Sequence, residues 1–166
     1  VLGLGSQVKA HNERRFSVPW EPPGPHLRDY VACMRAIWES WQHGTRPAYE
    51  GEYYQYRLTG SMFNPGPIEY PDIPVIISAG NAFNARLAGE ICDGIAVHSF
   101  TSFRYMQEVL IPALREGAVA TGKDPAQMRV QGGGFIVTGR TDAEVQDALA
   151  RTRREIAYYG STRGYA

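Results

Sequence analysis

The chain has 166 residues, of which 43% are hydrophobic and 20% are charged, so it is long enough for one domain with a packed core. Lysine plus arginine and aspartate plus glutamate both number 17, and the net charge of 0 lacks the basic excess of nucleic-acid-binding proteins. With no signal peptide and no apolar run of about 18 residues, neither secretion nor a membrane span is expected. Cys33 and Cys92 form no CxxC motif, which favours the reducing cytoplasm.

Strands and helices are predicted to alternate along the chain. A short strand at 1–5 is followed by a polar loop at 6–25, a helix at 26–43 that ends before Gly44, and a proline-rich hairpin insert at about 45–73. Strands at 74–80, 95–98 and 128–137 follow, each with a helix after it, at about 82–91, 102–119 and 141–159. This alternation predicts an α/β fold with a parallel sheet, and both a doubly wound sheet and a barrel fit it.

The carboxyl ends of the predicted strands are the expected ligand site, because both architectures bind ligands there. Small and polar residues gather at these ends: Gly5, Ser6, His11 and Asn12 after the first strand, Ser78, Ala79, Gly80 and Asn81 after the second, and His98 at the end of the third. Small residues let a flat ring or a phosphate approach the backbone, and amides at a helix start can bind an anion. A tight turn and a solvated loop are the alternative interpretations of the same segments.

Single side chains add further hypotheses. His11 lies among polar and charged residues and could donate a proton or fix a substrate. Trp20 either covers an apolar pocket or packs against the following helix, and His98 is either a site residue or the polar end of its strand. No two His, Asp or Glu residues show the spacing of metal ligands, so no metal is expected.

Several segments together resemble the luciferase-like monooxygenase family. Val1-Leu-Gly-Leu-Gly-Ser6 followed by His11-Asn-Glu13 is similar to the family's fourth strand and loop, and Tyr49-Glu-Gly-Glu-Tyr-Tyr54 with the following prolines resembles its insert before the fifth strand. Arg86-Leu-Ala-Gly89, then Cys92-Asp-Gly94, and later Thr141-Asp-Ala-Glu144 resemble its subsequent helices and turns. Within the family, the chain looks most like the branch that depends on coenzyme F420.

The resemblance implies a partial (β/α)8 TIM barrel, in which residues 1–166 cover about strands four to seven of an incomplete domain. It implies an F420-dependent oxidoreductase that passes hydride between the deazaflavin and a small organic substrate. His11 is then the first candidate for the catalytic proton donor, and Trp20 and His98 belong to the substrate pocket. The cofactor would lie against Gly5, Ser6, Asn12, Ser78, Ala79, Gly80 and Asn81.

Alternatives to this interpretation remain open. An FMN-dependent luciferase-like monooxygenase has the same fold, and a non-catalytic fragment or interaction module belongs to another class. Gln7-Val8 stands where the sugar-phosphate dehydrogenases of the family have Gly-Glu, so no active-site glutamate is assigned and a sugar phosphate is not favoured as the substrate. Family members often form homodimers, so a homodimer is left open. No nucleic-acid or membrane partner is expected, and the location is expected to be cytoplasmic.

Overall fold

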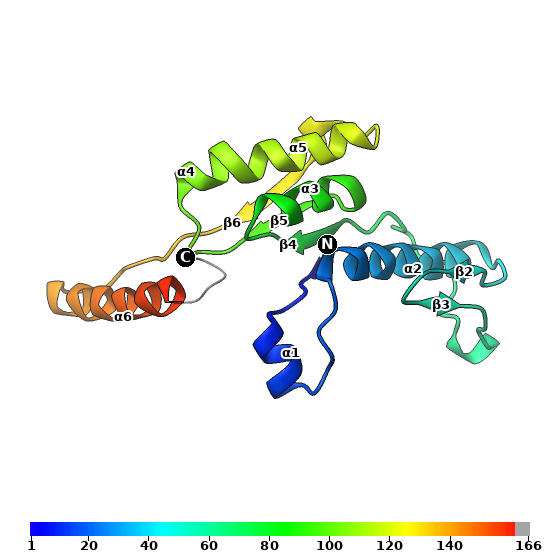
Figure 1. The fold of residues 1–166 in the computed structure, drawn as a ribbon, viewed down its shortest axis with the longest axis horizontal. Helices are drawn as coiled ribbons and strands as arrows, with labels where there is room; N and C mark the ends of the chain where they lie inside the picture. The colour runs from blue at the N-terminus through cyan, green and yellow to red at the C-terminus, as the bar shows by residue number, and fades with distance from the viewer. Residues whose placement is uncertain (162–166) are drawn as a thin grey trace.

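A computed structural model describes residues 1–161, so the last five residues of the predicted domain, 162–166, lie outside the described residues. Within 1–161, β1 (Leu2–Leu4), β4 (Val75–Ser78), β5 (Gly94–Val97) and β6 (Arg129–Gly132) form a four-stranded sheet in that order (Figure 1). Each strand of this sheet pairs in parallel with its neighbour in that order. The strand order never reverses, unlike in a doubly wound sheet, and therefore favours the barrel of the two predicted architectures.

The helices that connect the strands pack against one face of the sheet. They are α2 (Pro23–His43), α3 (Ala82–Ile91) and a helical segment made of α4 (Phe103–Tyr105), the π-helical turn η2 (Met106–Leu110) and α5 (Ile111–Ala120). In Figure 1, α3 and α5 lie side by side along the strands. Ile77 and Ile95 are paired in register and fully buried beneath these helices. Burial of each side chain stabilises the fold by roughly 1.5–3 kcal/mol.

The helix α2 follows the predicted apolar spacing. Leu27, Val31, Met34 and Trp38 recur at steps of three and four and contact the core under the sheet. A proline in the first turn suits the helix start, since the amide that proline lacks has no helical acceptor there. At the other end, Gly44 adopts a left-handed conformation with φ of 63° and donates its amide to the carbonyl of Ser40. The helix is therefore fixed in length at both ends.

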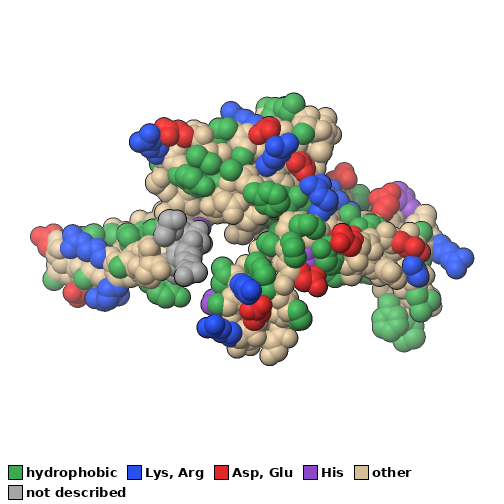
Figure 2. Space-filling view, in the orientation of Figure 1, with side chains coloured by type: hydrophobic (Ala, Val, Ile, Leu, Met, Phe, Trp, Pro, Cys, Tyr) green, Lys and Arg blue, Asp and Glu red, His purple; other side chains and the backbone are tan. Residues whose placement is uncertain are grey.

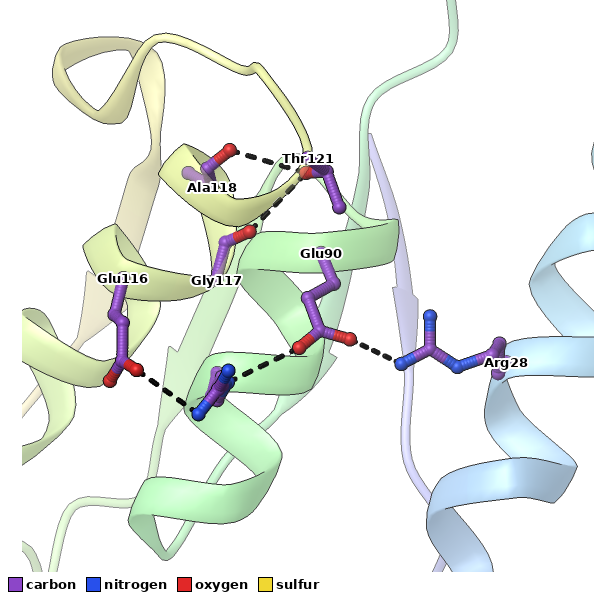
Figure 3. A network of polar contacts seen from close by, with 7 residues as sticks. Arg28, Glu90, Glu116, Gly117, Ala118 and Thr121 are labelled. Atoms are coloured by element: carbon purple, nitrogen blue, oxygen red, sulfur yellow. Dashed lines mark hydrogen bonds and ion pairs between the residues drawn. The ribbon is translucent and has the colours of Figure 1, made fainter.

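Glycines bring α3 and α5 unusually close together. A Cβ added to Gly89 would lie 2.1 Å from the carbonyl oxygen of Leu114, and one added to Gly117 would lie 2.0 Å from that of Arg86. Around this contact, Glu90 binds both Arg28 of α2 and Arg86, and Arg86 also pairs with Glu116 at 3.0 Å (Figure 3). This chain of charges links α2, α3 and α5. The hydrogen bond from Arg28, together with that from Arg86, outweighs partial burial and lowers the pKa of Glu90.

Three predictions from the sequence need correction. The expected loop at 6–25 contains α1 (Lys9–Arg15), whose sequence holds neither Gly nor Pro and which has an ion pair between Lys9 and Glu13, one turn apart. The last strand ends at Gly132 rather than near residue 137, because three consecutive glycines offer no side chains to pack. The helix expected at 26–43 begins three residues earlier, at Pro23. The predicted hairpin of the insert is present and short, with β2 (Tyr49–Glu50) paired to β3 (Gln55–Tyr56), and a 3-10 turn (Ser61–Phe63) follows it.

Side chains cap the starts of the later helices. Asn81 accepts a hydrogen bond from the amide of Asn84, Ser102 caps the helix that begins at Phe103, and Thr141 accepts from the amide of Glu144. The last of these opens α6 (Asp142–Gly160). A further 3-10 turn, η3 (Pro125–Gln127), precedes β6. Across the described residues, no helix combines the length and apolar character needed to cross a membrane.

Candidate active site at the carboxyl end of the sheet

The sheet face opposite the helices is lined by small residues near the carboxyl ends of its strands. Ser78 pairs in register with Ala96, and a Cβ added to Gly5 would lie 3.7 Å from the Cβ of Ser78. Gly5 and Ser78 are exposed, and Ala96 is half-buried. Within the described residues, these positions leave a surface without large side chains, on which a planar ring could lie. We call Gly5, Ser78 and Ala96 the sheet floor.

A cavity of about 280 Å³ lies next to β1, between the segment after that strand, the start of α2 and the hairpin. Four of the predicted site residues line it: Gly5, Ser6, Asn12 and Trp20. The side-chain amide of Asn12 donates to the carbonyl of Ser6 at 3.3 Å, which ties α1 to the end of β1. The structure therefore brings together residues that are up to 15 positions apart in the sequence.

His11 projects from α1 and is exposed. Its Nδ1 lies 3.2 Å from Oε1 of Gln7, and the ring is absent from the lining of the 280 Å³ cavity. Gln7 itself has φ of 59°, a left-handed conformation that is uncommon outside glycine. The turn between β1 and α1 thus carries backbone strain next to the cavity, and strained backbone is often found near functional sites.

Residues 78–81 divide between site and core. Ser78 is exposed, whereas the side chain of Ala79 is buried in the core and its amide donates to the carbonyl of Ala96 at 3.1 Å. Gly80 is half-buried, and the side chain of Asn81 is occupied in capping α3. Ser78 and the backbone of Gly80 are therefore the atoms of this segment best placed to meet a ligand.

His98 lies apart from this cavity. Its Nδ1 accepts a hydrogen bond from the amide of Phe100 at 3.1 Å, and its ring meets that of Tyr159 edge-on with centroids 4.5 Å apart. The contact joins the end of β5 to the end of α6. A role for His98 in a substrate pocket would require that pocket to extend beyond the 280 Å³ cavity.

Two cavity residues were not singled out from the sequence. His26 stacks on Tyr54, with centroids 5.3 Å apart and planes 9° apart, and its Nε2 lies 3.0 Å from the Tyr54 hydroxyl. His26 lies near the start of α2, and Tyr54 lies in the hairpin turn directly before β3. The contact between His26 and Tyr54 joins distant parts of the chain, so no local sequence pattern predicts it. One local signal exists: His26 and Tyr30 are four positions apart on one helix face, and both line the cavity.

A larger cavity of about 1100 Å³ lies at the opposite edge of the sheet. Residues at the amino ends of the strands, Pro74, Asp93 and Arg129, line it together with Arg35 and Trp41 of α2. Ligands of parallel α/β folds bind at the carboxyl ends of strands, so size alone does not make this cavity the site. Among the described residues, no group of three or more His, Cys, Asp or Glu side chains could hold a metal ion.

A model of the luciferase-like monooxygenase family matches residues 1–165. The chain belongs to this family. Among its relatives, an uncharacterized protein of Mycobacterium tuberculosis is 42% identical over 165 residues, or 99% of this chain and 48% of the relative. An F420-dependent glucose-6-phosphate dehydrogenase of Mycolicibacterium gilvum is 38% identical over 99 residues, or 60% of this chain and 27% of the relative. The chain thus spans about half the length, or less, of these curated relatives.

Two solved structures share this fold. An F420-dependent secondary alcohol dehydrogenase in complex with an F420-acetone adduct superposes with a TM-score of 0.63 and 22% identity, over 78% of this chain and 38% of that one. A coenzyme F420-dependent tetrahydromethanopterin reductase from Methanopyrus kandleri gives a TM-score of 0.59 and 22% identity, over 80% and 40%. The predicted α/β class, as part of a TIM barrel, and the predicted family are confirmed.

Proposed function

We propose that the chain is part of an F420-dependent oxidoreductase that transfers hydride between the deazaflavin and a small organic substrate. The observation that carries the proposal is the sheet floor, because a flat ring needs an uncovered surface without large side chains at the carboxyl ends of the strands. The F420-dependent relatives and structural neighbours of the family support the choice of cofactor.

The residues around the sheet floor suit a deazaflavin that supplies or accepts the hydride. Gly5 and Ser78 leave room for the ring, while Ser6, Gly80 and Asn81 would lie beside it or beside the cofactor phosphate. Asn12 holds the turn after β1 by its bond to Ser6, and Ala79 would contribute through its backbone alone, since its side chain is buried. The protein's own contribution is to bind and orient the cofactor and substrate.

We propose His11 as the proton donor to the substrate, on the basis of its position after β1. Its present partner is Gln7, so a move of the side chain or of α1 would have to bring the ring to the substrate. Trp20, which lines the 280 Å³ cavity, would cover the apolar part of the substrate. His98 would form the limit of the substrate pocket on the side away from this cavity. Replacement of His11 by Ala in the full-length protein should lower turnover while cofactor affinity is kept.

Location and assembly are proposed on separate grounds. A cytoplasmic location is supported by the two buried free cysteines, Cys33 and Cys92. A homodimer is supported by the insert, where Figure 2 shows hydrophobic side chains gathered on the surface and where Leu58, Met62 and Phe63 are strongly exposed. The expected partner in the reaction is a small molecule rather than a nucleic acid or membrane.

Titration of the full-length protein with coenzyme F420, and separately with FMN, tests the proposal through quenching of fluorescence. Saturable binding of F420 with much weaker binding of FMN is the expected result. Preference for FMN would move the protein to the monooxygenase alternative. Binding of neither cofactor would contradict an oxidoreductase role and favour an interaction module.

A further inference from the structure

A carboxylate buried beside the cavity holds the hairpin of the insert against α2. Asp29 is 8% exposed and accepts hydrogen bonds from the Tyr49 hydroxyl and from the amides of Tyr53 and Tyr54, the last at 2.9 Å. Burial opposes the charged form, but these three donors outweigh it and lower the pKa of Asp29 below its ordinary value. Asp29 therefore holds the hairpin as an anion.

The hairpin fits this carboxylate closely. A Cβ added to Gly51 would lie 1.8 Å from Oδ1 of Asp29, so only glycine lets the turn approach this near. The amide of Gly51 is satisfied within the turn by the carbonyl of Tyr54 at 2.8 Å. The position of Tyr54 is thus set by the docking of the turn on Asp29 rather than by the two-residue strands of the hairpin, which are too short to be rigid by themselves.

Tyr54 in turn completes one wall of the cavity. Its ring lies flat on His26, the edge of Tyr30 meets it with centroids 5.3 Å apart, and its hydroxyl lies within hydrogen-bond distance of His26. All three side chains line the 280 Å³ cavity. The same cavity is lined by Leu4 at the end of β1 and by Gly5, which follows this strand and belongs to the sheet floor.

The lining of the cavity limits the chemistry of its ligand. Leu4, Val18, Pro19 and Leu27 give it an apolar body, and among the described residues that line it none is Lys or Arg. Glu21 adds an acidic group instead. A phosphate ester would find no cation here, whereas a small uncharged molecule with one oxygen would bury its apolar part and need one polar contact.

We propose that the His26–Tyr54 pair binds the oxygen of a small uncharged alcohol or carbonyl substrate, and that Asp29 is the positioning residue that holds Tyr54 in place. This inference rests on the proposed oxidoreductase function. The pair suits both oxidation states of such a substrate. With the proton between the two residues on Nε2 of His26, the Tyr54 hydroxyl is free to donate to a carbonyl; with the proton supplied by Tyr54, its oxygen accepts from an alcohol.

The test uses the full-length protein with F420, and cyclohexanol, cyclohexanone and glucose 6-phosphate as probes. Cyclohexanol and cyclohexanone should be turned over and glucose 6-phosphate should not. Tyr54→Phe and Asp29→Asn should each raise KM for cyclohexanol about 10-fold, the loss of about one hydrogen bond, with little change in kcat or in F420 affinity. The double variant should lose no more than either single variant, because both act through one contact. Tyr70→Phe, in an exposed part of the same insert, is the matched control and should change nothing.

Each other outcome has a distinct meaning. If F420 binds but Tyr54→Phe keeps the wild-type KM, or if only glucose 6-phosphate reacts, or if none of the probes reacts, the inference is wrong and the proposed function stands. Additive losses in the double variant would show that Asp29 acts on the fold alone, which overturns its positioning role. Failure of the wild type to bind F420 would instead overturn the proposed function.

Discussion

Glycines on the two sides of the sheet have opposite surroundings. On the helix-covered side, Gly89 and Gly117 stand where any Cβ would strike the backbone of the facing helix. On the open side, a Cβ on Gly3 would meet nothing within 4 Å, and one on Gly5 would make only an ordinary contact at 3.7 Å. Packing within the described chain explains why Gly89 and Gly117 have no side chain. It does not explain the absence of a side chain at Gly3 and Gly5. The covered side is built for stability, and the open side is available for binding.

The largest expected effect lies on the covered side. Gly89→Ala should lower the free energy of unfolding by about 3 kcal/mol, because the added methyl group forces α3 away from the carbonyl of Leu114. Urea denaturation of the full-length protein measures the loss. Gly160→Ala in α6 is a matched control, since its Cβ would make an ordinary contact at 3.7 Å with Phe100. Equal stability of the two variants would contradict the close packing of α3 and α5.

A smaller effect, dependent on pH, is expected at the hairpin. Asp29→Asn should lower the free energy of unfolding by about 2 kcal/mol at neutral pH, because a buried, hydrogen-bonded carboxylate loses its charge. Since the folded-state pKa of Asp29 lies below the unfolded value, this stabilisation is present above the unfolded value of about 3.9 and is lost as the pH falls through the folded one. Urea midpoints of wild type and variant should therefore converge at low pH. A constant difference at all pH values would assign the loss to packing.

The smallest effect concerns the charges that link the helices. Glu90→Gln should lower the free energy of unfolding by about 1 kcal/mol, because Glu90 forms ion pairs with Arg28 and Arg86 (Figure 3). The effect is small because water reaches these partly exposed pairs. The difference should shrink in high salt, which screens the pairs. Thermal unfolding at low and high ionic strength measures it. Salt independence would indicate that Glu90 acts through its packing rather than its charge.

The sequence predicts the covered side better than the open side. Features of the covered side depend on local spacing, so each can be predicted from one short segment. Examples are the apolar residues from Leu27 to Trp38 and the caps at Asn81, Ser102 and Thr141. The helix α1 is hidden in the segment 6–25 because the four prolines that follow it make the whole segment look like a loop. The His26–Tyr54 pair depends on Asp29 meeting a turn more than 20 residues away, and no local pattern records such a contact.

Replacement of Ser78 by Leu in the full-length protein tests the central claim, that the sheet floor carries the deazaflavin, most directly. The side chain is exposed, so the free energy of unfolding should stay within about 0.5 kcal/mol of wild type. The affinity for F420, measured by fluorescence quenching, should weaken by about 10-fold or more, because a leucine side chain on the sheet floor would keep the deazaflavin ring from contacting it. Ser61→Leu, at an exposed position of the insert, should leave F420 affinity unchanged. Wild-type F420 affinity in stable Ser78→Leu would contradict the account.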